Sequence, residues 1–121
     1  MNRYCKVCGT TQGIEYHHRI YRSHNPNLVN CKLNLVDLCY IHHRDHKKGV
    51  HHNKELDQKL KKELQDKLEE LFINDYLTRE EINEILQISE KALNRLLKTL
   101  QINDRVYVKE DVIRAIMGKI I

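Results

Sequence analysis

Residues 34–43 read Asn-Leu-Val-Asp-Leu-Cys-Tyr-Ile-His-His, an apolar run that ends in one cysteine and two histidines. The run, extended back to Leu33, predicts a strand over 33–38. A Cys-x-x-His pair follows it, and a Cys-x-x-Cys pair occurs near the N-terminus. Structural zinc takes four tetrahedral nitrogen or sulfur ligands, usually supplied as two such pairs from separate turns. The predicted zinc ligands are Cys5, Cys8, Cys39 and His42, with Cys31 as an alternative to His42.

The two halves of the 121-residue chain differ in composition. Residues 1–52 contain all four cysteines, all eight histidines, and eight Lys/Arg against three Asp/Glu, a net charge of +5. Cysteines at this spacing in a reducing cytosol indicate metal binding more than disulfides. A module of about fifty residues has little core and usually needs such a staple. The positive charge favours a polyanionic partner, with a merely soluble basic surface as the alternative.

Residues 53–121 lack cysteine and histidine and are rich in helix formers. Apolar residues recur every four positions, which predicts an amphipathic helix over 53–72. The stripe consists of Leu56, Leu60, Leu64, Leu68 and Phe72. A leucine stripe carries no chemistry, so internal packing and a dimer contact are both open for this helix.

A capping box, Thr78-Arg-Glu-Glu81, predicts the start of a further helix. Ser89 can cap another, and residues 105–108 and 110–117 predict a short strand and a closing helix. This order resembles excisionase-type winged helix-turn-helix domains, which bind DNA. The eight basic and eight acidic residues from Ile73 onward cancel, however, so a protein contact is as open as a nucleic-acid contact.

The first half also contains more histidines than one structural site can use. Partial alternation over 13–20 predicts a strand that places His17 and His18 on opposite faces. Three stretches, "EYHHRI", "NLVDLC" and "CYIHH", resemble the HNH endonuclease family, and "HHRDHKKGVHHNKEL" looks like small family members of phage and prophage origin. The resemblance covers residues 4 to about 56.

This resemblance implies a second metal, Mg²⁺ or another divalent ion, and a catalytic role for the histidines. His17 and His43 would bind that metal, and His18 would be the general base, because imidazole titrates near neutral pH. Asn34 would hold His18 in the right tautomer. The family often has a further ligand where this chain has Lys47, so we expect His51 to be the last ligand, with His46 as second choice.

Taken together, the patterns predict an α+β chain with three segments. Residues 1–53 would form a zinc-stapled ββα-metal nuclease module, 54–73 a packing helix, and 74–121 a helical, winged helix-turn-helix-like domain. No apolar run follows Met1 or approaches the length of a membrane span, so we expect a cytoplasmic protein in a bacterial host cell, with no membrane partner.

The expected partner is nucleic acid, with DNA favoured over RNA, and a homodimer or protein contact through residues 54–121 is possible in addition. A non-catalytic zinc-dependent binding protein, such as a phage regulator or an inhibitor of host defence, is the alternative, because a binding module needs the zinc but not the second set of histidines. The expected nucleic-acid contacts are Arg19, Arg44, Lys47, Lys48, Lys91, Asn94 and Arg95.

Overall fold

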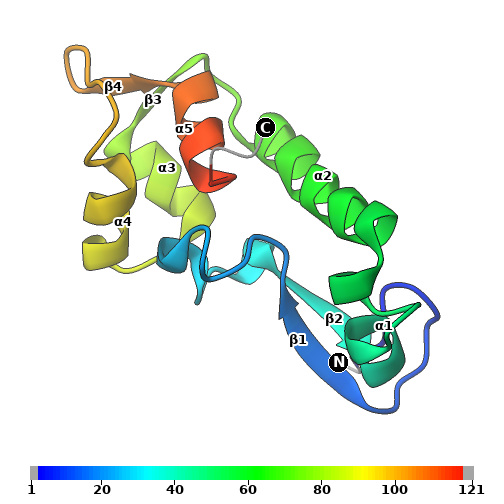
Figure 1. Cartoon of the computed structure of the whole chain (residues 1–121). Coiled ribbons are helices and arrows are strands. Elements are labelled where there is room, and N and C mark those ends of the chain that lie inside the picture. The colour runs from blue at the N-terminus through cyan, green and yellow to red at the C-terminus, as the bar shows by residue number, and fades with distance from the viewer. Residues whose placement is uncertain (1–2, 119–121) are drawn as a thin grey trace.

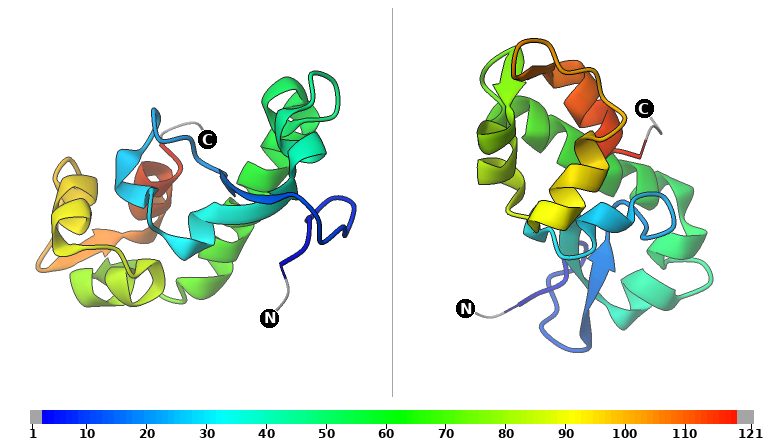
Figure 2. Two further views of the ribbon diagram at one scale, coloured as in Figure 1. Left: turned by 90° about the horizontal axis from the view of Figure 1, so that it is seen from below. Right: turned by 90° about the vertical axis from the view of Figure 1, so that its left-hand side faces the viewer.

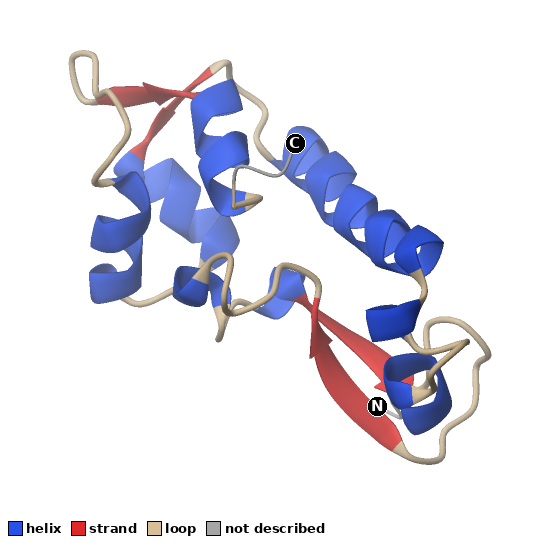
Figure 3. Ribbon diagram, viewed as in Figure 1, coloured by secondary structure: helices blue, strands red, loops and turns tan. Residues whose placement is uncertain are grey.

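The computed structural model describes residues 3–118 and shows a mixed helix and strand chain of the α+β class (Figure 3). Strand β1 (Ile14–His18) pairs antiparallel with β2 (Leu35–Cys39), with His17 opposite Val36. The second strand begins later than predicted, because residues 32–34 form a 3-10 turn in which the Asn34 N–H donates to the Cys31 carbonyl. A short 3-10 helix, Pro26–Leu28, lies in the loop between the strands.

Helix α1 (Tyr40–Arg44) follows β2 directly, so the hairpin and the helix form one continuous unit. The chain then turns at Gly49 into a 3-10 turn, Val50–His52. A Cβ atom at Gly49 would lie 2.5 Å from the Asp45 carbonyl oxygen, and the Gly49 N–H donates to that same oxygen. Only glycine permits this close return, which brings residues 50–52 back against α1.

Helix α2 (Lys54–Leu71) runs along one side of the molecule and connects the hairpin unit to the C-terminal elements (Figure 1). The Asn53 side chain caps its N-terminus by accepting from the Leu56 N–H. The predicted leucine stripe is buried within the chain at Leu60, Leu64 and Leu68. No helix within residues 3–118, this 18-residue one included, is long and apolar enough to cross a membrane.

The C-terminal elements follow the predicted order, with one addition. Three helices form as expected: α3 (Arg79–Leu86), α4 (Glu90–Leu97) and α5 (Lys109–Ile116). The capping box of α3 is complete, because the Thr78 side chain accepts from the Glu81 N–H and the Glu81 side chain accepts from the Thr78 N–H. Strand β4 (Val106–Val108) pairs with β3 (Tyr76–Thr78), which the sequence analysis missed. Three residues are too few to show an alternating pattern.

Apolar packing crosses the boundary expected at residue 53. The smaller core lies under the β1–β2 hairpin and includes Val36, Leu38 and Leu60. The larger core joins the C-terminal helices to Ile20, Leu28 and Cys31 from the first loop. The loop 20–31 therefore lies against α4 and α5, as two further views show (Figure 2). The three-segment division is one of composition; its outermost residues, 1–2 and 119–121, lie outside the described part.

Asn25 adds a polar contact to this packing. Its buried amide group donates to the carbonyl oxygens of Ala115 and Ile116, both at 3.1 Å. These carbonyls lie in the last turn of α5, where the regular helical hydrogen bonds end, although the Ala115 carbonyl also accepts from the Gly118 N–H. The N-terminal loop thus caps the last helix of the chain.

Substitution of a single leucine of α2 tests whether the stripe is a true core. Leu68 has no exposed surface, so Leu68→Ala should lower the free energy of unfolding by about 2–5 kcal/mol, through lost burial and a cavity. Chemical denaturation would measure it. The neighbouring exposed Lys67→Ala should change stability by no more than about 0.5 kcal/mol; equal effects would contradict the packing.

Candidate metal centres and active site

The turn from Cys5 to Cys8 folds around the sulfur atom of Cys5. The Val7 N–H donates to the Cys5 Sγ at 3.4 Å, and the Gly9 N–H donates to the Cys5 carbonyl. Gly9 has a φ of +77°, a conformation that favours glycine. The Lys6 N–H donates to the Asp37 carbonyl, which ties the turn to β2. The turn is thereby held next to the end of that strand.

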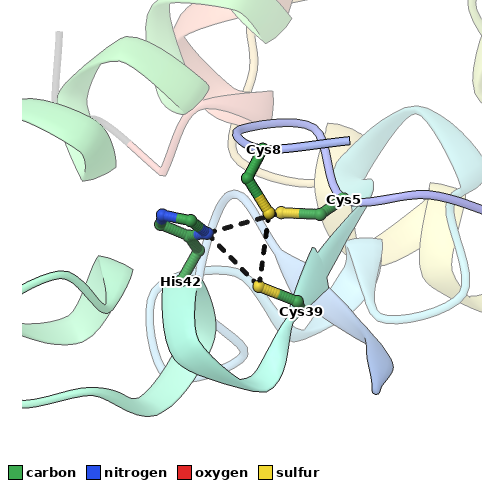
Figure 4. Close-up of side chains that lie close together, drawn as sticks. All are labelled: Cys5, Cys8, Cys39 and His42. Atoms are coloured by element: carbon green, nitrogen blue, oxygen red, sulfur yellow. Dashed lines mark hydrogen bonds between the residues drawn. The ribbon is translucent and has the colours of Figure 1, made fainter. Parts of the chain in front are cut away.

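The junction of β2 and α1 supplies the second pair of ligands. Cys39 ends the strand and His42 lies one helical turn later, so both point to the Cys5–Cys8 turn (Figure 4). The Cys39 Sγ lies 3.2 Å from His42 Nδ1 and 3.8 Å from the Cys8 Sγ, and the Cys5 Sγ lies 3.7 Å from His42 Nδ1. Two sulfurs on one tetrahedral zinc are about 3.8 Å apart. The cluster fits a metal such as zinc.

The environment of Cys5 favours its thiolate. Burial opposes ionisation, but backbone hydrogen bonds from Cys39, Cys8 and Val7 outweigh it and lower the Cys5 pKa to about 6. A lowered thiol pKa suits a metal ligand, since zinc binds the thiolate form. Cys31, the alternative ligand, lies in the larger core, where its thiol donates to the Leu86 carbonyl and burial raises its pKa. It is not near the cluster.

A second cluster consists of His17, His43 and His51. Their ring centroids form a triangle with three sides of 5.2 Å, and one ligand nitrogen from each lies within 4.8 Å of the others. The three come from β1, α1 and the turn after Gly49. His46, the other choice for the last ligand, instead lies with its ring 4.9 Å from that of His52, and both are exposed.

His17 is the buried member of this histidine cluster. Its side chain is 2% exposed, and its Nε2 has no hydrogen-bond partner among the described residues. Burial, and then the neighbouring His43 and His51, lower its pKa to about 3, and burial also lowers that of His51. His17 is therefore neutral at pH 7. A buried neutral nitrogen without a partner costs free energy unless something binds it, and a divalent metal ion fits that need.

Two residues that sequence reasoning missed surround the histidine cluster. Glu15 shares a face of β1 with His17, and its carboxylate accepts from His43 Nδ1 at 2.9 Å. This contact leaves the other nitrogen of His43 for a metal, as outer carboxylates do in metal sites. Tyr21 donates to Asp57 at 2.7 Å and packs against His17 and His51. For Glu15 the sequence did contain a signal, because residues two apart in a strand share a face and Glu15 lies two residues before His17.

The contact expected between Asn34 and His18 does not form among the described residues, and each side chain has other partners. His18 Nε2 donates to the Val29 carbonyl at 2.9 Å. Asn34 is 1% exposed; its Oδ1 accepts from the Ile20 N–H and its Nδ2 donates to the carbonyls of Ile20 and Leu28. Its side chain is fully used in holding the loop that carries Val29. The influence of Asn34 on His18 is therefore indirect.

The basic residues expected to contact nucleic acid divide into two groups. Arg19 is engaged inside the molecule, where its guanidinium donates to Glu63 and to the Leu60 carbonyl. That engagement removes it from the expected interface. Arg44 is exposed but paired with Glu15. The exposed residues that form no ion pair in the described part of the chain are Lys47, Lys48, Lys91 and Arg95, and Asn94 is exposed as well.

Comparison with known proteins adds no relative: no family model, no curated protein and no solved structure matches this chain.

Removal of the zinc ligands should unfold the hairpin unit. Cys5→Ser or Cys39→Ser should abolish tight zinc binding and with it folding free energy on the order of 10 kcal/mol. Mass spectrometry of the native protein should show one tightly bound zinc, and circular dichroism should show the loss of structure. Cys31→Ala, at a cysteine outside the cluster, should keep the zinc. Purified protein without zinc would contradict the assignment.

The two choices for the last ligand can be separated by metal titration. His51→Ala should weaken divalent-metal binding to the histidine cluster by at least about 100-fold, because losing a ligand exceeds the 10–100-fold effect of losing an outer partner. His46→Ala should bind as wild type, since His46 lies outside the cluster. Isothermal titration of zinc-loaded protein with Mn²⁺ or Ni²⁺ would measure both. Equal affinities of the two variants would refute the placement.

Proposed function

We propose that this protein is a metal-dependent nuclease of the HNH type that hydrolyses phosphodiester bonds, with DNA favoured over RNA as substrate. The observation that carries the proposal is the second cluster, His17, His43 and His51, which exists in addition to the cysteine-rich one. A protein that only binds needs a structural metal but no second site. A triangle of three imidazole rings, one of them buried with a nitrogen that has no partner among the described residues, suits a divalent ion.

The hairpin and its following helix supply the order of elements that a ββα-metal module has. His17 comes from the first strand and His43 from the helix, and both face the same side of the hairpin. The adjacent His18 points to the other face, because side chains alternate along a strand. Within the described residues β1 pairs only with β2, and the two histidines lie on opposite faces of this hairpin.

His18 has the chemistry of a general base. A carbonyl only accepts, so the contact with Val29 places a proton on Nε2 and leaves Nδ1 of the neutral ring free to take one from water. Imidazole does this near neutral pH. A divalent ion in the histidine cluster would supply positive charge to the phosphate and the leaving oxygen. Glu15 holds His43, and Asn34 holds the loop that orients His18.

The C-terminal elements support a DNA-binding role through α4. Its buried side is leucine-rich, whereas Lys91, Asn94 and Arg95 are exposed. Two capped helices, a two-stranded sheet and a closing helix give the order of a winged helix-turn-helix, with strands of only three residues in place of a long wing. We infer that this part helps to hold the substrate and that cleavage takes place at the histidines.

Variants of the two adjacent histidines test the proposal. His18→Ala should lower the cleavage rate by roughly 100- to 10,000-fold while zinc content, fold and DNA affinity stay nearly unchanged, because only a proton acceptor is lost. His17→Ala should lose both rate and metal affinity, and part of its activity should return at high Mg²⁺ or Mn²⁺. Cleavage of plasmid and single-stranded substrates by zinc-loaded protein would measure both.

The same assay also tests the alternative, a protein that binds its partner without cleaving it. Absence of wild-type cleavage with Mg²⁺, Mn²⁺ and Ni²⁺, together with biological activity retained in His18→Ala, would replace the nuclease with the non-catalytic binding protein.

A further inference from the structure

Several basic residues of the C-terminal elements gather at one place, although the charges of these elements cancel in the sequence. Lys91, Asn94, Arg95 and Lys98 line one hollow of about 530 Å³ beside α4, together with Arg79. No acidic side chain of the described residues lines it. The nearest acid on α4 is Glu90, which pairs with Arg79. A different hollow is of mixed charge, because Glu69, Asp75 and Glu110 line it together with Lys109 and Arg114.

A second, smaller hollow of about 190 Å³ is lined by two of the same basic residues. Lys91 and Arg95 form one of its walls, and Asn27, Val29 and Asn30 of the first loop form the other. The described residues that line it include no acid either. The loop packs on α4 through Pro26–Leu28, so the two walls are held together by the larger core. Lys91 and Arg95 are thus shared by two hollows that both lack negative charge.

The loop wall leads directly to the proposed general base. Val29 lines the smaller hollow, and its carbonyl accepts the hydrogen bond from His18 Nε2. The residue that holds His18 thus lines the same hollow as Lys91 and Arg95. The first loop and α4 are far apart in the sequence but lie side by side in the fold (Figure 2).

We propose that this surface, the loop 27–30 together with the basic side of α4, binds the phosphate backbone of the same nucleic-acid strand that is cleaved at His18. The inference rests on the proposed nuclease function and deepens it. Lysine and arginine side chains neutralise phosphates and release counterions, and a groove without acids suits that role. The C-terminal part then positions the substrate for cleavage at the histidines and does not bind a separate, distant nucleic-acid site.

Binding, measured apart from cleavage, tests this surface. The probe is a short fluorescein-labelled DNA duplex, titrated with full-length zinc-loaded protein without added Mg²⁺, by fluorescence anisotropy between about 50 and 200 mM salt. Lys91→Glu/Arg95→Glu should weaken binding about tenfold or more, equally for unrelated sequences. The slope of log affinity against log salt should become shallower by about 2, because two phosphate contacts are lost.

A charge-matched control and a loop variant make the test specific. Lys62→Glu/Arg114→Glu changes the net charge equally on α2 and α5, outside both hollows, and should keep the wild-type salt slope. Asn30→Asp, which puts a carboxylate on the loop wall, should weaken binding several-fold by itself. Circular dichroism and zinc content should be unchanged in all three variants, which excludes unfolding.

Several results would overturn the inference. If Lys91→Glu/Arg95→Glu binds like the control variant, the hollows do not hold nucleic acid, and a protein partner becomes the occupant to test. If Asn30→Asp binds like wild type while the α4 variant is weakened, α4 acts alone and the surface does not continue to His18. A failed nuclease proposal looks different, because wild-type protein would then bind the duplex through these residues but not cleave it.

Discussion

The direct junction between β2 and α1 is the constraint on which both metal clusters depend. The strand ends at Cys39 and the helix begins at the next residue, so no flexible link separates them. Successive residues of an α-helix point about 100° apart. The neighbours His42 and His43 therefore face different clusters, one beside Cys39 and the other beside His17. A loop at this position would leave both sites without fixed geometry.

The two clusters differ in a way that fits two different tasks. The cysteine-rich one has four ligands, enough to close the coordination of a structural metal. The histidine cluster has three ligands, so an ion held there would keep positions for water or substrate. Glu15 and Tyr21 link the histidine cluster to its surroundings through hydrogen bonds. Two clusters that could each hold a metal thus lie close together within about fifty residues of sequence.

The loop between the strands connects these sites to the C-terminal helices. Asn34 pins its start, Asn25 caps α5, and Ile20 and Leu28 enter the larger core. The loop is therefore held from both directions, and the carbonyl that orients His18 belongs to it. Movement of the C-terminal helices would reach His18 through this segment. The physical unit of the molecule is larger than the N-terminal half.

Local spacing in the sequence was enough to predict the features whose geometry is local. The pairs Cys5–Cys8 and Cys39–His42 lie within single turns, and the leucines of α2 follow the helical period, so residue positions alone indicated them. The α+β class followed from the same patterns. Strand β3 was missed because three residues are too few to show a period, and the start of β2 was misplaced because residues 32–34 form a 3-10 turn before it.

Features that depend on long-range approach came only from the folded chain. The choice of His51 over His46 depends on the tight return at Gly49, and the exclusion of Cys31 depends on its burial against α3. The same holds for two hydrogen bonds, from His18 to Val29 and from Arg19 to α2. Each joins residues that are not neighbours in the sequence, and no local pattern indicates the contact. Charge behaves in the same way. A net charge is a sum over a segment, whereas a binding surface depends on where packing places each side chain. In this fold, packing places basic groups of the C-terminal elements beside the loop that holds His18.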